Sequence, residues 1–114
     1  MDYTVAEIKN ILWEAEEAAA EAANKFFNER LGGVDRYACG FAWVDIYGIK
    51  GNTKLGKAMK AAGLRKDWTG KAWQIWNPSK HGAQNVDVKE AGARAAADVL
   101  KHYGFTAYVG SRLD

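Results

Sequence analysis

The sequence predicts an α+β fold in a single domain, residues 1–114, with a long N-terminal helix followed by a β-α-β-α-β core. Three observations support it. The first thirty residues are dense in strong helix formers, three short apolar runs alternate like strands, and two amphipathic segments separate those runs. The length suits one domain, and 48% hydrophobic residues suffice for a packed core. We expect a small sheet of at least three strands covered by helices.

Residues 1–32 contain the long helix. Thr4 followed by Glu7 is a capping-box pattern, and Gly32 and Gly33 supply the stop. A helix over 4–31 reaches roughly 40 Å at about 1.5 Å per residue. A domain of this size is only about 26 Å wide. We therefore expect the helix to overhang its domain and to mediate oligomerisation, most simply with a copy of itself.

An intramolecular helix that wraps its own sheet is the alternative. The residues expected in the oligomer contact are apolar or small and recur mostly at three- and four-residue steps: Ile8, Leu12, Ala19, Ala22 and Phe26. The alanines in the middle of the helix would let another backbone approach closely.

The core, residues 38–114, opens with "ACGFAWVDIYGI", which predicts a central strand because both of its faces are largely apolar. Asp45 is the polar exception on the aromatic face. "GNTKLGKAMKAAGL" predicts a short helix capped by Thr53 and stopped by Gly63. In the second strand, "KAWQIW", Trp73 and Ile75 share one face, and Gln74 and Trp76 the other.

The last predicted helix lies in "VDVKEAGARAAADVLKHYG". Asp87 followed by Glu90 indicates another capping box, and Gly104 ends the helix. "FTAYVGS" is the third predicted strand.

Charge is distributed unevenly along the chain. The net charge of +2 combines a balance of −4 over residues 1–30 with +6 over residues 31–114. Residues 50–80 hold eight basic side chains against Asp67 alone. A basic surface of this kind attracts phosphates, although a merely solvated lysine-rich surface is the alternative.

Composition also bears on location. No apolar run approaches the roughly 18 residues that span a bilayer, and the acidic, amphipathic N-terminus does not resemble a signal peptide. A single cysteine, Cys39, excludes an internal disulfide framework. We expect a cytoplasmic protein without a membrane partner.

Catalytic groups are not evident. Cys39 begins a strand, without the helix N-terminus or neighbouring histidine that lowers a thiol pKa. His81 and His102 lie 21 residues apart without ligand-spaced partners. The chain contains neither a Walker-type loop nor a GxGxxG motif. We therefore expect no enzyme, no metal and no cofactor.

A binding site is the remaining expectation. The polar loop "WNPSKHGAQN", five tryptophans and the "SRLD" tail suit a planar, anionic ligand such as a nucleotide, held by stacking and by charge-assisted hydrogen bonds. If the second and third strands are parallel neighbours, loop and tail emerge at one end of the sheet. A loop that only turns the chain is the alternative. The expected ligand-binding residues are polar or aromatic: Trp76, Asn77, Lys80, His81, Gln84, Asn85, Arg112 and Asp114.

Four stretches resemble a family of small phage proteins: "CGFAWVDI", "WQIWNPS", "VKEAGARAAADVL" and "VGSRLD". The family is the phage anti-Thoeris signal-sequestering proteins, often called sponges, and the similarity covers about residues 38–114. It implies a non-enzymatic homo-oligomer in the cytoplasm of an infected bacterium. Such a protein binds cyclic ADP-ribose isomers made by TIR-domain immune enzymes and so keeps the downstream effector off.

In residue terms, the resemblance implies that Arg112 contacts the adenine, and no aromatic partner maps cleanly. Two other functions stay open. The first is a single-stranded nucleic-acid binder that uses the basic stretch 50–80. The second is an inhibitor of a host enzyme that uses the alanine-rich helix as its contact face.

Overall fold

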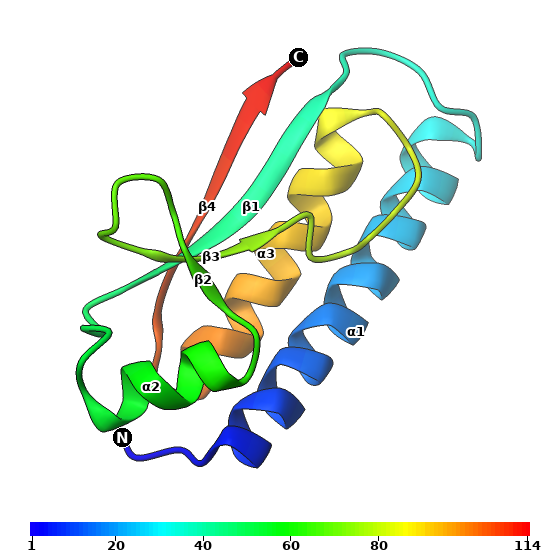
Figure 1. Ribbon diagram of the computed structural model, residues 1–114. Coiled ribbons are helices and arrows are strands. Elements are labelled where there is room, and N and C mark those ends of the chain that lie inside the picture. The colour runs from blue at the N-terminus through cyan, green and yellow to red at the C-terminus, as the bar shows by residue number, and fades with distance from the viewer.

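The computed structural model describes residues 1–114 and confirms the α+β class (Figure 1). The elements follow the predicted order with one addition, a two-residue strand before the second predicted strand. Their bounds are α1 Val5–Leu31, β1 Gly40–Tyr47, α2 Lys54–Ala61, β2 Arg65–Lys66, β3 Trp73–Trp76, α3 Val86–His102 and β4 Thr106–Leu113.

The four strands form one antiparallel sheet in the order β2-β3-β1-β4. β1 therefore lies inside the sheet, as its apolar faces predict. β3 and β4 both run antiparallel to β1, so they point in the same direction, but β1 separates them. The expectation that the second and third predicted strands are neighbours is wrong.

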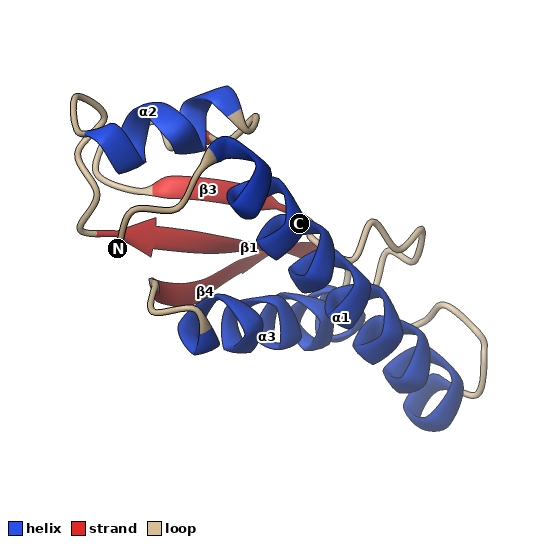
Figure 2. Ribbon diagram, turned by 90° about the horizontal axis from the view of Figure 1, so that it is seen from below, coloured by secondary structure: helices blue, strands red, loops and turns tan.

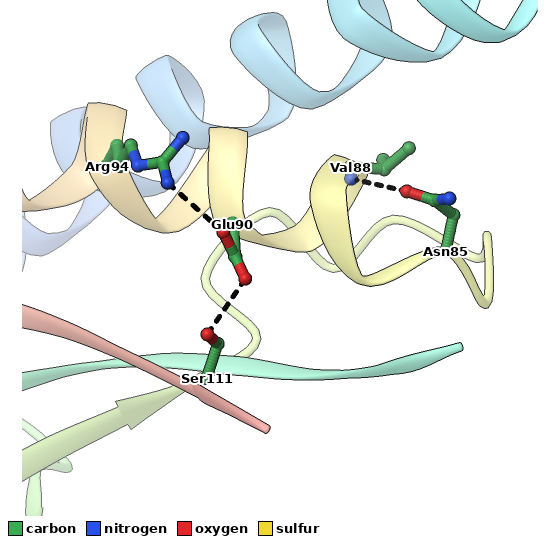
Figure 3. A network of polar contacts seen from close by, with 5 residues as sticks. All are labelled: Asn85, Val88, Glu90, Arg94 and Ser111. Carbon is green, nitrogen blue, oxygen red and sulfur yellow. Dashed lines mark hydrogen bonds and ion pairs between the residues drawn. The ribbon is translucent and has the colours of Figure 1, made fainter. Parts of the chain in front are cut away.

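Helices α1 and α3 run antiparallel, side by side, and cover one face of the sheet (Figures 1 and 2). Along β1 every second residue points into this layer, so Ala42, Val44 and Ile46 are buried. Glu90 of α3 ties the helix to the sheet, because its carboxylate accepts hydrogen bonds from Ser111 of β4 at 2.8 Å and from Arg94 at 3.1 Å (Figure 3).

The alanine-rich middle of α1 packs against α3. A Cβ atom added to Gly92 would lie 3.1 Å from the carbonyl oxygen of Ala19, so the two backbones nearly touch. Ala19 is fully buried, and Ile8 is 1% exposed. The small residues do admit a second backbone, but it belongs to the same chain. This corrects the expectation that Ile8 and Ala19 are free for an oligomer contact.

The other three residues of the expected contact are partly buried. Leu12 packs against the main core. Ala22 is of intermediate exposure, and Phe26 packs against a second, smaller core cluster.

That smaller cluster supports the C-terminal part of α1. It joins Ala23 and Leu31 of α1 to Ala83 and Val88. The molecule is 45 Å long, so α1 matches its longest dimension. The loop before α3 and the first turn of α3 thus pack against one side of the C-terminal part of α1.

Two of the three helix starts follow the sequence signals. Thr4 and Glu7 form the predicted capping box, and Thr53 caps α2. The N-cap of α3 is Asn85 instead of Asp87, because the helix begins at Val86. The side chain of Asn85 accepts a hydrogen bond of 3.0 Å from the Val88 amide (Figure 3).

None of the three helices is both long and apolar enough to pass through a membrane.

Candidate functional site

The sheet face opposite α1 and α3, here called the open face, carries most of the exposed aromatic side chains of the strands. Helices cover only one face of the sheet. Strand pairing sets residues opposite one another on this face, in rows such as Trp76–Trp43–Gly110. The larger side chains placed here by register are Phe41, Trp43, Asp45, Tyr47, Arg65, Gln74, Trp76, Tyr108 and Arg112.

Two stacked indoles occupy the middle of the open face. The rings of Trp43 and Trp76 are nearly parallel, with an interplanar angle of 8° and centroids 5.3 Å apart. Phe41 adjoins Trp76 at 5.6 Å between centroids. Trp76 remains 50% exposed, so this aromatic cluster offers a ring surface to solvent. Such surfaces stack on planar groups.

The position of Trp43 is fixed from two sides. An added Cβ at Gly110 would lie 2.4 Å from two atoms of the Trp43 ring, so only glycine leaves room for the indole there. The indole N–H donates to the Asp45 carboxylate at 3.1 Å. Gln74 donates to the other oxygen of Asp45 at 3.3 Å. Asp45, the polar exception in β1, thus serves to orient its neighbours.

Two cations lie beside the aromatic cluster. The guanidinium carbon of Arg112 is 5.4 Å from the centroid of Phe41, and the Lys89 ammonium is 5.2 Å from it. Lys89 also donates to the carbonyl of Gly40 at 2.9 Å. Neither cation has an acidic partner, because the two ion pairs of the structure involve other residues. Neither charge is therefore neutralised by an ion pair, and Arg112 is exposed.

A second aromatic pair extends the open face in the opposite direction. Tyr47 and Tyr108 meet edge to face, with centroids 5.9 Å apart and an interplanar angle of 62°. Both are exposed. The face therefore carries aromatic rings along the whole of β1.

The polar loop at 77–85 has a different role from the one expected. Lys80 pairs with Glu16 of α1 at 2.7 Å, and the hydrogen bond and negative charge of Glu16 raise the pKa of Lys80. The ring of His81 lies 4.9 Å from that of Phe27, and its Nδ1 accepts the Ala83 amide. Lys80 and His81 therefore contact α1 and do not lie on the open face.

The remaining loop residues also shape the chain. Asn85 is 1% exposed and donates to the Arg36 carbonyl in addition to its capping bond. Asn77 adopts a positive φ of 44°, and its backbone N–H donates to the Ala42 carbonyl. Gln84 is exposed, and its backbone N–H donates to the Asp35 carboxylate. The expectation that Asn85 faces a ligand is therefore corrected to a structural role, because its side chain is buried, whereas the half-buried Asn77 stays a prediction.

Loop and tail do meet at one end of the sheet, as expected. Gly40 donates to the Gln84 carbonyl, and the Asp114 amide donates to the Cys39 carbonyl. Lys80 and His81 of the loop contact α1, however, whereas Arg112 lies on the open face. Of the eight expected ligand residues, only Trp76 and Arg112 share a surface, where both contact Phe41.

Sequence reasoning missed the other members of this surface, chiefly Phe41, Trp43, Lys89, Tyr108 and Gly110. A signal was present in β1, where aromatic residues alternate with small or aliphatic ones. That alternation also fits a strand whose two faces are both apolar and buried, as the sequence analysis predicts. No three His, Cys, Asp or Glu side chains gather closely enough to hold a metal ion.

Comparison with protein-family models, with curated proteins and with solved structures found no match for the chain.

Proposed function

We propose that the protein is a non-enzymatic binding protein that holds a nucleotide by stacking its base on the open face. The observation that carries the proposal is the solvent-exposed stack of Trp43 and Trp76 with the unpaired Arg112 beside it. Stacking on one aromatic side chain contributes about 1–3 kcal/mol per base. The guanidinium adds a charge-assisted contact to phosphate or stacks on the base itself.

The ligand we propose first is a cyclic ADP-ribose isomer. It combines a planar base with two phosphates, which matches an aromatic surface next to cations. The resemblance to phage anti-Thoeris sponges implies the same ligand. In that role the protein acts in the cytoplasm of an infected bacterium, sequesters the signal and blocks TIR-based Thoeris immunity.

Calorimetry with a cyclic ADP-ribose isomer tests the proposal. Trp76→Ala removes half of the stack, and we expect affinity to fall about tenfold or more. Trp68→Ala is the matched control, because Trp68 is 96% exposed and lies in the β2–β3 turn, outside the open face. Equal affinities of the two variants would contradict the proposal.

Single-stranded nucleic acid is a second candidate, favoured by the length of the aromatic surface. Aromatic rings run from Phe41 to Tyr47 on a sheet face without a helix, which suits several bases in succession. Counterion release would make such binding fall steeply with salt, by about a thousandfold or more if six phosphates are neutralised. A diphosphate ligand should respond far less. Tight binding of an oligonucleotide with a steep salt slope, and none of the cyclic ligand, would favour this candidate.

We also retain a homo-oligomer as part of the proposal. Its contact cannot use Ile8 or Ala19, which are buried in the subunit. Trp13 of α1 is 67% exposed and is the largest apolar side chain on the outer surface of that helix. Light scattering of the wild type and of Trp13→Glu tests this: an oligomer that Trp13→Glu dissociates is expected, and a wild-type monomer at micromolar concentration contradicts it.

A further inference from the structure

A groove of about 700 Å³ lies at the edge of the sheet, between the C-terminal end of α2 and β2. Its lining combines three cations with two glycines, one leucine and one indole: Lys60, Arg65, Lys66, Gly51, Gly63, Leu64 and Trp73. We call it the basic groove. Its volume is in the range of ordinary small-molecule sites.

The charge in the basic groove is uncompensated. No acidic residue lines it, and none of its three cations takes part in an ion pair. Asp67 follows directly in sequence, but its carboxylate accepts the Thr69 hydroxyl and the Ala72 amide within its own turn. Partial desolvation opposes ionisation of Asp67, yet these hydrogen bonds prevail and lower its pKa. Its oxygens are engaged away from the cations.

One of the cations is held in place. Lys66 donates to the Ile49 carbonyl at 3.3 Å, and its ammonium lies 4.8 Å from the centroid of the Trp73 ring. The Trp73 indole N–H donates to the same carbonyl at 2.9 Å. An ammonium that is already fixed loses less conformational entropy when an anion binds. The space beside Gly51 is open, since an added Cβ there would meet no heavy atom within 4 Å.

The basic groove adjoins the open face through Arg65. Arg65 is directly paired with Gln74, whose side chain contacts Asp45 beside the stacked indoles. One strand spacing and two residues along a strand place the Cα atoms of Arg65 and Trp76 roughly 8 Å apart. Lys66 and Trp73, by contrast, belong to the row that ends at the buried Ile46 on the covered face, so the basic groove and the open face meet at Arg65 on the edge of the sheet.

We propose that the basic groove is a phosphate-binding site that takes a diphosphate or longer phosphate chain. The assignment deepens the proposed function, and it rests on that function only for the base that would stack next to it. The groove offers two neighbouring phosphates three cations: Lys66, which is held in place, and Lys60 and Arg65. Their ammonium and guanidinium groups supply charge-assisted hydrogen bonds.

The experiment measures the affinity of the full chain for inorganic pyrophosphate, adenosine and ADP by calorimetry. The test variant is Lys60→Gln with Arg65→Gln. The matched control is Lys57→Gln, because Lys57 is exposed on α2 but does not line the basic groove. We expect the wild type to bind ADP more tightly than adenosine. We expect the test variant, which lacks two charge-assisted contacts, to lose about a hundredfold or more in pyrophosphate and ADP affinity, and the control to lose none.

The outcomes separate this inference from the proposed function. If adenosine does not bind while pyrophosphate binds through Lys60 and Arg65, the groove stands and the stacking proposal fails. If pyrophosphate does not bind the wild type, or binds the test variant as tightly as the Lys57→Gln control, the groove assignment is overturned. Unchanged thermal unfolding of both variants verifies that an affinity loss is not a folding defect.

Discussion

The indole N–H of Trp43 donates a hydrogen bond of 3.1 Å to the carboxylate of Asp45, two residues along the same strand. Gln74 of the neighbouring strand donates to the second oxygen of that carboxylate. The ring of Trp43 is thus anchored before any ligand arrives. A surface whose rotamers are already fixed loses little side-chain entropy on binding, which favours affinity.

Replacing Asp45 with alanine should loosen this arrangement. The partly buried indole N–H and the Gln74 amide lose their acceptor, at a cost of about 1–3 kcal/mol in the free energy of unfolding. Asp45→Asn keeps one acceptor oxygen and should be milder. Urea denaturation of both variants measures the difference. Equal stabilities of Asp45→Ala and wild type would show that the carboxylate does not hold the ring.

Gly110→Ala should displace Trp43. The added methyl group would meet the indole at 2.4 Å, so the ring must leave its stack with Trp76. Overpacking of this kind costs about 1–3 kcal/mol. The nuclear magnetic resonance signal of the Trp43 indole N–H should shift, and nucleotide affinity should fall. Gly82→Ala is the control, because an added Cβ there meets nothing within 4 Å.

Arg112→Gln should weaken ligand binding while leaving the fold intact. Loss of one charge-assisted contact costs about 1.5–3 kcal/mol, which is a factor of roughly ten to a hundred in affinity. Arg36→Gln is a matched control, because Arg36 also lies over an aromatic ring, that of Tyr37, but in the segment between α1 and β1. Calorimetry that gives both variants the same affinity would remove Arg112 from the site.

Ala19→Leu should destabilise the subunit. The larger side chain enters the contact between α1 and α3, where Gly92 leaves no spare volume, and we expect a loss of about 1–3 kcal/mol or more. Ala6→Leu, at an exposed position of the same helix, should stay within about 0.5 kcal/mol of the wild type. Thermal unfolding of the two variants makes the comparison. A stable, dissociated Ala19→Leu subunit would instead support an intermolecular role for this residue.

Asn85→Ala should affect stability and leave affinity unchanged. It removes the cap of α3 and the bond to Arg36, and caps contribute about 0.5–2 kcal/mol. Gln84→Ala, next to it, removes an exposed side chain and should be neutral. A ligand affinity that falls for Asn85→Ala in protein that is still fully folded would return Asn85 to the binding site.

The parts of the fold that the sequence predicts correctly depend on signals between residues close together in the chain, namely helix caps and strand alternation. The start and end of α1 follow from Thr4, Glu7 and Gly32, whose effects extend over a single helical turn. The alternation of Trp73 and Ile75 with Gln74 and Trp76 correctly assigns their faces. These patterns depend on neighbours within a few residues, which the sequence displays directly.

The missed features depend on distant residues. Asn85 and Asp87 are both good caps, and the choice between them is set by the backbone of Arg36, 49 residues from Asn85. The alanines of α1 predict that another backbone packs closely against the helix, but they do not show whether that backbone belongs to the same chain. β2 has two residues, too few for any periodicity. The aromatic alternation of β1 is the same whether its second face is covered or open, so the candidate site could not be placed from sequence.

The arrangement of the sheet bears on how the chain folds during synthesis. α1 leaves the ribosome first, but the helix it packs on is α3, and the central strand β1 completes its pairing only with β4. At roughly 5–20 residues per second, translation from α1 to β4 takes on the order of ten seconds. Throughout that interval the nascent helix displays its apolar edge without a partner. The sheet and the helix layer can therefore be completed only after β4 has been synthesised.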